Sequence, residues 1–468
     1  MKKLFLLLSI LCSAFAGFAD DSQAPKYVFY FIGDGMGLGH VNIAQTYWRT
    51  HVDAENPLTM YQFPIALACN TYSAKNHITD SAAAGSALST GTKTRNGMLG
   101  MDADTVATYS VALDYKNKGY GIAIATSVYP DDATPGAFYT HVPARSMYTQ
   151  IGFDMAKSQY DMFAGSSLRG LKDKKGNDTG LKKALTDAGY VIAHGPQEYE
   201  KVKNSDKIIL LSTNNTPNIG FTIDSIPGAL TLPFITKACI EHEMRVSPDK
   251  FFMMIEGGNI DWAAHANDGG CVVKEIINFN ECIKQAYDFY LQHPDETLII
   301  VTADHNTGGM SLGVVGGPHY HANLDYLDYQ KISISEFQEQ CNKWKKDKAK
   351  LSWDEMKAYL GDKLGLYSKI ELKDTEDEEL QQLFNDNFVL DNQSHTKTLY
   401  STISNFVTCV FGIYQRHLGI GWTTYSHCGD MVPFFAIGKG SEQFLQAGKH
   451  NTFIDNTDIP KTLRSLLK

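Results

Sequence analysis

The stretch Tyr27-Val28-Phe29-Tyr30-Phe31-Ile32-Gly33-Asp34-Gly35 joins an unbroken apolar run to a carboxylate. Three further runs have the same form: residues 121–126 lead into Asp131 and Asp132, residues 251–255 end at Glu256, and residues 297–301 reach Asp304. Uninterrupted apolar runs of this length predict strands that are buried on both faces. We therefore expect an α/β fold with a central, mainly parallel sheet covered by helices on both faces.

Amphipathic stretches between these runs supply the crossovers that a parallel sheet requires. The clearest spans residues 272–291, where Val273, Ile276, Ile283 and Tyr287 recur near helical spacing. These segments predict helices that pack their apolar side on the sheet.

Acidic residues at the carboxyl ends of the predicted strands are the first functional signal. Ligands of open parallel sheets bind in the crevice beyond these strand ends. Asp34 alone is explained by an Asp-Gly turn. Acids at four strand ends in one crevice would repel one another and could not all stay ionised without cations. The pattern therefore predicts bound metal.

Histidines supply nitrogen ligands for such a site. Asp261 and His265 are spaced i and i+4, which places both on one helix face where they can hold a single ion. His305 follows Asp304 at a strand end, and His427 precedes the apolar run 432–437. Each also has a purely structural interpretation, as a helix-terminal Asp beside an unrelated His or as a His before a strand.

Residues 79–94, TDSAAAGSALSTGTKT, predict a helix with Ser81 in its first turn and a break at Gly91. A hydroxyl there lies among unpaired backbone N–H groups at the positive end of the helix dipole, which favours an anion. The alternative is a capping serine on a tightly packed helix. A P-loop is excluded, because Gly85 and Gly91 have the wrong spacing and Thr92 separates Gly91 from Lys93.

Composition and the N-terminus limit the class of protein. The 468 residues carry a formal charge of −10, so the chain has no basic footprint for nucleic acid. Residues 1–19 have the features of a signal peptide: Lys2 and Lys3, an apolar run over 4–11, and Ala14-Phe15-Ala16 as a cleavage site. That run is too short to span a membrane. We expect export to the periplasm or the medium, with no membrane span.

The remaining features concern domain organisation. Residues 322–420 are charged and helical, with a capping box at Ser352-Trp353-Asp354-Glu355 and no motif that carries chemistry. We interpret them as an insertion on an α/β domain made of residues 20–321 and 421–468. Seven cysteines follow the signal peptide, so at least one has no partner within the chain, and their pairing stays open.

Taken together, the motifs resemble those of the bacterial alkaline phosphatase family. They occur in that family's order and cover about residues 27–320 and 421–468: Gly33-Asp34-Gly35-Met36-Gly37, Thr79-Asp80-Ser81-Ala82-Ala83, Asp132-Ala133-Thr134-Pro135, Glu256-Gly257-Gly258, Asp261 to His265, Thr302-Ala303-Asp304-His305 and His427. The resemblance implies a broad-specificity phosphate monoester hydrolase that releases inorganic phosphate through a phosphoserine on Ser81. It also suggests a homodimer.

The resemblance further implies two zinc ions and one magnesium ion. One zinc would lie beside Ser81 and be held by Asp304, His305 and one oxygen of Asp34. The second zinc would be held by Asp261, His265 and His427. The magnesium would be held by the other oxygen of Asp34, Thr134 and Glu256, with Asp132 orienting its waters. Arg145 would clamp the phosphoryl oxygens.

Two positions vary within the family that the motifs resemble. Some members carry Lys where this chain has Trp262, and Lys helps to hold phosphate, which Trp262 cannot do by charge. Others carry His in place of Asp132, and Asp132 favours magnesium. We therefore predict that Trp262 contacts the substrate without holding phosphate by charge.

Other functions remain possible from the sequence. A phosphodiesterase or a sulfatase-like hydrolase could use the same metal core. An exported phosphate- or metal-binding protein without turnover would belong to a different class. Ser81 as nucleophile and Arg145 as a clamp for a terminal phosphoryl group favour the monoesterase.

Overall fold

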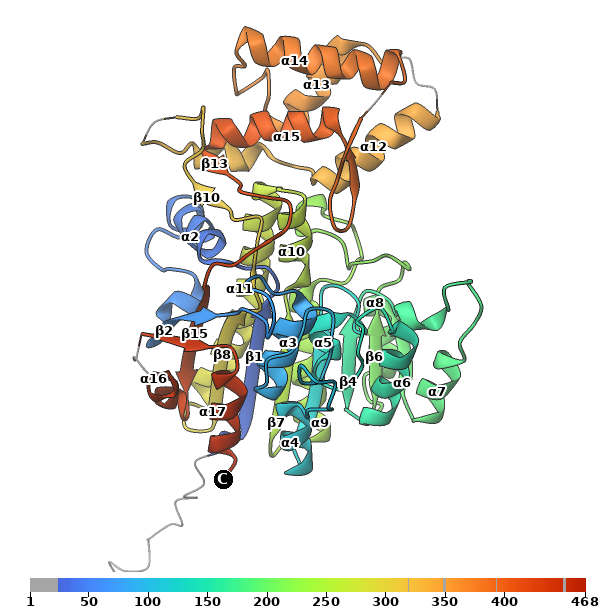
Figure 1. The fold of residues 1–468 in the computed structure, drawn as a ribbon, viewed down its shortest axis with the longest axis vertical. Coiled ribbons are helices and arrows are strands. Elements are labelled where there is room, and N and C mark those ends of the chain that lie inside the picture. Colours follow the sequence, from blue (N-terminus) through green and yellow to red (C-terminus); the bar gives the residue numbers. More distant parts are fainter. Residues whose placement is uncertain (1–23, 319, 348–350, 393, 449–451) are drawn as a thin grey trace, which may run out of the picture.

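The fold is that of a computed structural model, which describes residues 24–318, 320–347, 351–392, 394–448 and 452–468. A ten-stranded sheet forms its centre (Figure 1). β15 runs antiparallel to both of its neighbours, and the other pairings in this sheet are parallel. The strand order across the sheet is β16 (Phe453–Asp455), β2 (Ile65–Asn70), β15 (Val432–Gly438), β8 (Thr297–Ala303), β1 (Tyr27–Gly33), β7 (Phe251–Glu256), β3 (Gly121–Thr126), β4 (Met162–Gly165), β6 (Ile208–Leu211) and β5 (Val191–His194).

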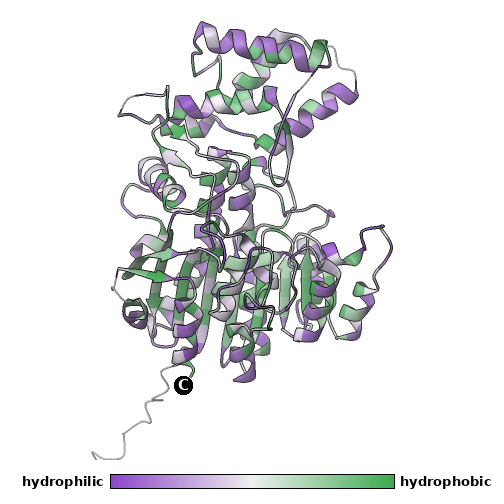
Figure 2. Cartoon of the chain, viewed as in Figure 1, coloured by the Kyte–Doolittle hydropathy of each residue, from purple (hydrophilic) through white to green (hydrophobic). Residues whose placement is uncertain are grey.

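Successive side chains of a strand point to opposite faces of the sheet, so these apolar strands expose hydrophobic groups on both faces. Helices cover both faces. On one face Phe31 of β1 packs edge-on against Phe279 of α11 (Gly269–Gln292), with ring centres 5.8 Å apart. On the other face Tyr30 packs against Phe138 at 5.9 Å. The strands form a continuous hydrophobic layer (Figure 2). The predicted α/β fold is confirmed.

The other elements of the sheet region surround this centre. They are the helices α2 (Leu38–Tyr47), α3 (Ser81–Thr90), α4 (Val111–Asn117), α5 (Ala133–Gly136), α6 (Tyr148–Ser158), α7 (Leu181–Asp187), α8 (Gly195–Val202), α9 (Leu232–Val246), α10 (Gly258–His265), α16 (Phe444–Ala447) and α17 (Asp458–Leu466), and the short strands β9 (Asn306–Thr307), β10 (Ser311–Leu312), β13 (Ile420–Gly421) and β14 (His427–Cys428).

Helix α3 is built from small residues because it is buried on every side. The side chain of Asp80 caps it by accepting a hydrogen bond from the N–H of Ala83, at 3.0 Å. Ser81 is the first helical residue, so the interpretation of Ser81 as the cap is wrong. A Cβ atom at Gly85 would lie only 3.2 Å from the Cα of Thr134 on α5, which explains why this helix contains glycine. Close packing thus fixes α3, and with it Ser81.

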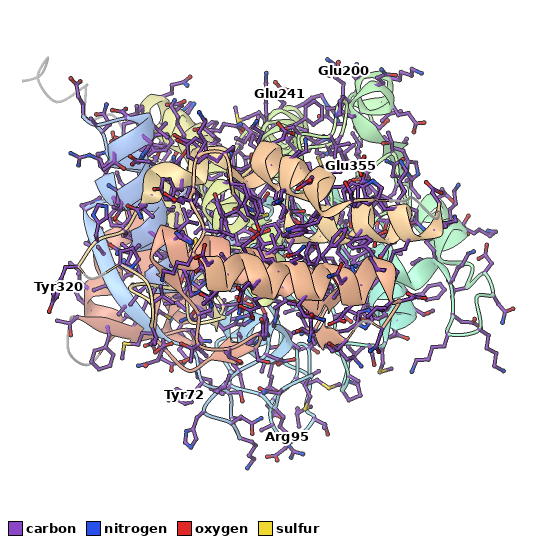
Figure 3. The ribbon with its side chains drawn as sticks, turned by 90° about the horizontal axis from the view of Figure 1, so that it is seen from above. Tyr72, Arg95, Glu200, Glu241, Tyr320 and Glu355 are labelled. Atoms are coloured by element: carbon purple, nitrogen blue, oxygen red, sulfur yellow. The ribbon has the colours of Figure 1, made fainter. Side chains whose placement is uncertain are left out.

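Residues 322–420 form helices that lie away from the sheet, at the top of Figure 1. Seen from above, these helices cross in front of the sheet region, with Glu355 projecting from them (Figure 3). The predicted capping box of Ser352 and Glu355 is present at the start of α13. The elements of this segment are α12 (Ile334–Lys346), α13 (Trp353–Leu364), α14 (Asp374–Phe384), α15 (Asn405–Leu418), β11 (His395–Lys397) and β12 (Thr402–Ser404).

Two sequence-based questions concern export and covalent links. The predicted signal peptide lies outside the described residues. In the described part of the chain, no helix is both long and apolar enough to cross a membrane. All seven cysteines of that part are free.

We expect Gly85→Leu to destabilise the protein by about 1–3 kcal/mol, because the added side chain overpacks the contact between α3 and α5. The shift of α3 should also lower activity. Gly412→Ala is the control, since a Cβ atom there meets nothing within 4 Å, and removing a helical glycine stabilises by up to about 1 kcal/mol. Urea denaturation measures both variants. Equal stability of Gly85→Leu and the parent protein would contradict the contact.

Candidate active site

The sheet register brings the predicted acidic residues together. Gly33, just before Asp34, lies opposite Ala303, just before Asp304, on the neighbouring parallel strand. Ile32 lies opposite Glu256 on the other side. The carboxyl ends of β1, β7 and β8 therefore place three acids at one edge of the sheet, as the sequence predicted.

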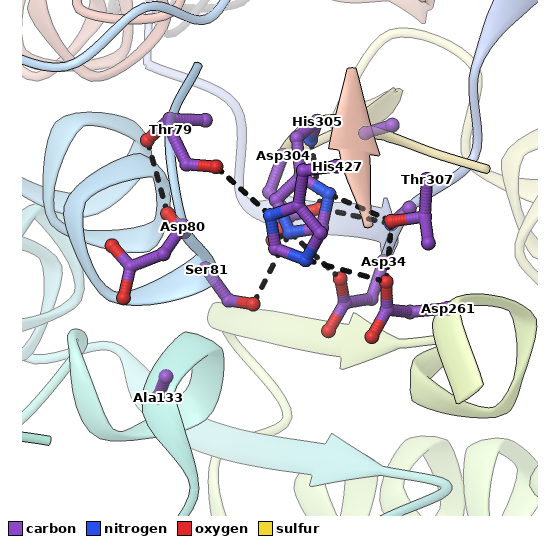
Figure 4. A network of polar contacts seen from close by, with 12 residues as sticks. Asp34, Thr79, Asp80, Ser81, Ala133, Asp261, Asp304, His305, Thr307 and His427 are labelled. Atoms are coloured by element: carbon purple, nitrogen blue, oxygen red, sulfur yellow. Dashed lines mark hydrogen bonds and ion pairs between the residues drawn. The ribbon is translucent and has the colours of Figure 1, made fainter. Parts of the chain in front are cut away.

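Asp34, Asp304 and His305 form one group of possible metal ligands (Figure 4). The Nε2 atom of His305 lies 3.3 Å from Oδ1 of Asp34 and 3.2 Å from Oδ2 of Asp304. The Oγ atom of Ser81 lies 3.2 Å from the same nitrogen. The hydroxyl at the start of α3 is thus next to this group.

A second group gathers around Asp261. Asp261, His305 and His427 offer ligand atoms that lie within 4.8 Å of one another. His265, one turn after Asp261 on α10, places Nε2 3.4 Å from Oδ1 of Asp261 and 3.1 Å from Nε2 of His427. The predicted pair on α10 therefore shares one face and meets His427.

The three histidines are oriented by their other ring nitrogen. The Nδ1–H of His265 donates to the carbonyl of Tyr425 at 2.7 Å, and that of His427 donates to the carbonyl of Thr79 at 2.8 Å. Nδ1 of His305 lies 3.2 Å from the hydroxyl of Thr307. Because Nδ1 is engaged, Nε2 of each ring is directed at the carboxylates, the arrangement that metal-ligating histidines use.

Thr307 connects the two groups of ligands. Its hydroxyl donates to Oδ1 of Asp261 at 2.5 Å and lies beside His305. Residues 306–307 form β9, which pairs antiparallel with β14, so His427 lies directly opposite Thr307. This short ribbon carries His427 to the site. Sequence reasoning missed Thr307, because a threonine after a histidine carries no signal of its own.

Oxygen donors form a third set beside Asp34. Glu256, the last residue of β7, accepts a hydrogen bond from the hydroxyl of Thr126. Asp132 caps α5, and Thr134 is buried on that helix. The carboxylate of Asp132 also pairs with Arg145 at 3.2 Å and with Arg169 at 3.5 Å. The sequence did not indicate Arg169, which lies in no recognisable motif.

Arg145 lies beside α3, the helix that begins at Ser81. Its guanidinium contacts Asp80 at 3.4 Å and Asp132 at 3.2 Å, and its side chain is 23% exposed. Asp80 immediately precedes Ser81 in the chain. The two carboxylates therefore hold the guanidinium fork close to Ser81, while part of it stays accessible to a ligand.

The acids of the site have strongly shifted pKa values. Burial, followed by the charges of Asp304 and Asp261, raises the pKa of Asp34 well above its ordinary value. Burial also raises the pKa of Asp304 to about 7 and that of Glu256 to about 8. Without cations, several of these groups retain protons at neutral pH.

The pKa values of Asp132, His305 and His427 shift in the opposite direction. Burial acts to raise the pKa of Asp132, but Arg169 and Arg145 outweigh it and the net shift is downward. Burial lowers the pKa of His305 well below its ordinary value and also lowers that of His427. Neutral imidazole is the form that binds metal.

The donors fit bound cations. Among the buried oxygen atoms of the described residues that have no hydrogen-bond partner, four belong to this site: Oδ1 of Asp34, Oδ2 of Asp261, Oδ2 of Asp304 and Oγ1 of Thr134. A buried carboxylate oxygen without a partner is costly, and coordination to a metal removes that cost. The unpaired atoms belong to all three sets of ligands.

Trp262 lies at the edge of the site, and an unexpected residue covers it. The ring of Tyr400 stacks on Trp262 with centres 4.5 Å apart and meets His265 edge-on at 5.1 Å. Tyr400 follows β11 in the segment 322–420, for which the sequence indicated no chemistry. Its contact with Trp262, 138 positions earlier in the chain, could not be predicted from a local sequence pattern.

Comparisons with known proteins agree with this geometry. The sequence profile described as "Alkaline phosphatase" matches residues 25–167 and 181–468. The chain belongs to the alkaline phosphatase family. It is 29% identical over 453 residues to Alkaline phosphatase 3 of Bacillus subtilis, covering 95% of this chain and 89% of that relative. This family membership makes the chain a metal-dependent phosphomonoesterase.

Solved alkaline phosphatases share the fold. A cold-active alkaline phosphatase from Shewanella sp. is 25% identical, with a TM-score of 0.78, and the match covers 94% of this chain and 99% of the other. The Thermus thermophilus alkaline phosphatase is 22% identical, with a TM-score of 0.77 over 95% of this chain and 92% of the other. The second likeness concerns the fold alone.

We expect the metal-free protein to lose stability as the pH rises from about 6.5 to about 8, because below this range the lowered pKa values of His305 and His427 act in the opposite direction. Asp304 and Glu256 keep their protons in the folded chain up to pKa values of about 7 and about 8, whereas unfolded carboxyl groups release theirs near pH 4. The folded state therefore binds more protons in this window, and deprotonation favours unfolding. Thermal denaturation of chelator-treated protein across this range measures the slope.

Protein reloaded with zinc and magnesium is the control for this experiment. Bound cations neutralise the ionised carboxylates, so the gap in melting temperature between loaded and chelated protein should widen as the pH rises. A gap that stays constant from about pH 6.5 to about pH 8 would show that these acids are not what the metals neutralise.

Proposed function

We propose that this phosphomonoesterase has broad specificity and forms a phosphoserine on Ser81. The observation that carries the proposal is the position of the Ser81 hydroxyl, which lies 3.2 Å from His305 at the start of α3. Unpaired N–H groups and the helix dipole favour an alkoxide and a phosphoryl group at this point.

We assign two zinc ions and one magnesium ion to the donor sets. Asp34, Asp304 and His305 suit one zinc, and Asp261, His265 and His427 suit the other, because imidazole with carboxylate favours zinc. Asp34, Thr134, Glu256 and Asp132 offer only oxygen, which suits magnesium. Bound metals would supply charge stabilisation for the attacking and leaving oxygens of the displacement.

The chain's own residues then perform separate tasks. Ser81 Oγ loses its proton and attacks phosphorus, the ester oxygen leaves and takes up a proton, and water hydrolyses the phosphoserine to inorganic phosphate and free Ser81. Arg145 offers a planar fork that matches two non-bridging phosphoryl oxygens. Asp80 and Asp132 hold that fork in place through contacts of 3.4 Å and 3.2 Å.

This arrangement favours monoesters over the alternatives. A phosphodiester has one non-bridging oxygen fewer than a phosphate monoester, and a sulfate ester carries one negative charge less than the monoester dianion, so both should bind Arg145 more weakly. A binding protein without turnover could use the Ser81 hydroxyl as a donor to an anion, but the Bacillus subtilis relatives to which the chain is similar are alkaline phosphatases. Neither alternative is favoured by the family membership.

The domain division of the chain, its export and its oligomeric state are also proposals. We assign catalysis to an α/β domain of residues 20–321 and 421–468 and treat residues 322–420 as a helical insertion on it. Export through cleavage of residues 1–19, with release into the periplasm or the medium, stays a prediction. Homodimer formation stays a prediction as well.

We expect Ser81→Ala to abolish phosphoenzyme formation and to lower turnover by at least about a thousandfold, because the nucleophile is lost. Its metal content should remain nearly intact, since the ligands are untouched. Phosphoserine trapping at acid pH and elemental analysis measure the two effects. Ser89→Ala is a matched control on the same helix, because the Ser89 hydroxyl donates to the carbonyl of Ala137 instead. A phosphorylated Ser81→Ala protein would overturn the assignment.

We expect Arg145→Lys to lower kcat/KM by about ten- to a hundredfold and to weaken inhibition by phosphate, because Lys cannot bind two phosphoryl oxygens at once. Metal content should not change. Arg95→Lys serves as the control, since its side chain is 50% exposed and pairs only loosely with Asp104, at 3.8 Å. Unaltered phosphate inhibition in Arg145→Lys would exclude Arg145 as the clamp.

A further inference from the structure

A cavity of about 550 Å³ lies beside the candidate active site. One side is formed by the loop that follows β6, over residues 212–221, and the opposite side by the start of α12 and the start of β12. This volume is within the range of pockets that bind small organic molecules. The cavity is more than large enough for a sugar-sized group.

The cavity and the reaction centre share an aromatic wall. Trp262 and Tyr400 both line the cavity, and their rings are stacked at 4.5 Å. Trp262 directly follows Asp261, and Tyr400 lies 5.1 Å from the ring of His265. An ester bound at Ser81 therefore has this wall, and the cavity that it borders, close to its organic part.

The charges around the cavity are all of one sign. Its described lining includes the carboxylates of Asp224, Glu336 and Glu339 and no lysine, arginine or histidine. Burial, followed by the charges of Asp224 and Glu339, raises the pKa of Glu336, so these carboxylates act on one another. Lys343 partly offsets this effect from outside the lining.

Most of the other lining groups are neutral hydrogen-bonding groups. Hydroxyl and amide side chains come from both sides of the cavity, among them Thr213, Asn214, Asn218, Gln338 and Ser401. Such groups bind hydroxyl-rich molecules, and the faces of Trp and Tyr bind sugar rings and cations. Arg145 and Arg169 do not line the cavity, and both pair with Asp132.

We propose that this cavity binds the organic part of the phosphate monoester and selects hydroxyl-rich groups that are neutral or positively charged over anionic ones. The proposal rests on the proposed function, because it places the phosphoryl group at Ser81 and Arg145. Guanidinium groups at one end and carboxylates at the other match a substrate with a negative phosphoryl group and a neutral or cationic remainder. A second negative charge on the substrate would face Glu336 and Glu339.

Two matched pairs of substrates test this selectivity in the metal-loaded enzyme. Choline phosphate and 3,3-dimethylbutyl phosphate have the same shape and differ by one positive charge. Glucose 6-phosphate and 6-phosphogluconate differ by one negative charge and also in shape, since the second is an open chain, so in this pair the Glu339→Lys variant separates the effect of charge from that of shape. We expect kcat/KM to be about three- to tenfold higher for choline phosphate and for glucose 6-phosphate within each pair, and both ratios should shrink as ionic strength rises.

Variants of the cavity identify the groups responsible. Glu336→Gln and Glu339→Gln should each move both ratios toward one, and Glu339→Lys should reverse the preference within the glucose 6-phosphate pair. Glu378→Gln is the control, because it removes one charge from exposed α14, and Glu378 does not line the cavity. Thermal denaturation establishes that each variant is folded.

The outcomes separate this proposal from the proposed function. If wild type forms the phosphoserine and hydrolyses phenyl phosphate, but both pairs show ratios of one that Glu339→Lys leaves unchanged, the cavity proposal is wrong and the function stands. If no phosphate monoester is hydrolysed, the function itself fails. Ratios that change equally in Glu378→Gln and Glu339→Gln would mean that overall charge, and not the cavity, sets the preference.

Discussion

Repulsion between buried carboxylates is the constraint on which this structure depends. The parallel register of β1, β7 and β8 holds Asp34, Glu256 and Asp304 together, because Glu256 ends its strand and the two aspartates directly follow theirs. Burial raises the pKa of all three acids. Protons or cations must balance these charges, so the folding equilibrium is coupled to the binding of protons or cations at the site.

The surrounding residues keep this cluster rigid. Carbonyl and hydroxyl groups fix the ring orientation of His265, His305 and His427 before any ion binds. The tight contact of α3 with α5 does the same for Ser81, since Gly85 leaves no room for the helix to move inward. If Ser81 is the nucleophile, as proposed, it loses little conformational freedom when it reacts, which is what positioning contributes to catalysis.

The sequence predicted the parts of the site that follow from local pattern. Three of these signals can each be recognised within a few consecutive residues: the acids at strand ends, the i, i+4 pair Asp261 and His265, and the helix of small residues after Asp80. The chain length between these motifs did not matter, because parallel pairing brings strand ends together. Ser81 was interpreted as a possible cap, and the structure gives that task to Asp80, since both residue types favour the position and only backbone geometry separates them.

Contacts between distant segments could not be predicted in this way. Arg169 reaches Asp132 from the segment that follows β4, and Thr307 contacts both Asp261 of α10 and His305 after β8. Neither residue belongs to a pattern that sequence alone distinguishes. The contact of Tyr400 was the hardest to predict, because this residue lies in the charged, helical segment 322–420 and stacks on the ring of Trp262 in the sheet region.

The position of Tyr400 bears on how a phosphomonoesterase can discriminate at all. The phosphoryl group is the same in every monoester, so a site that contacts only this group treats all such substrates alike. Selectivity requires side chains that meet the organic part of the ester. The described chain offers Trp262 from α10 and Tyr400 from the segment 322–420 at that place, with a carboxylate-lined cavity behind them. If the cavity binds the organic part as proposed, the segment 322–420, which supplies none of the assigned metal ligands, contributes through Tyr400 to the choice of substrate.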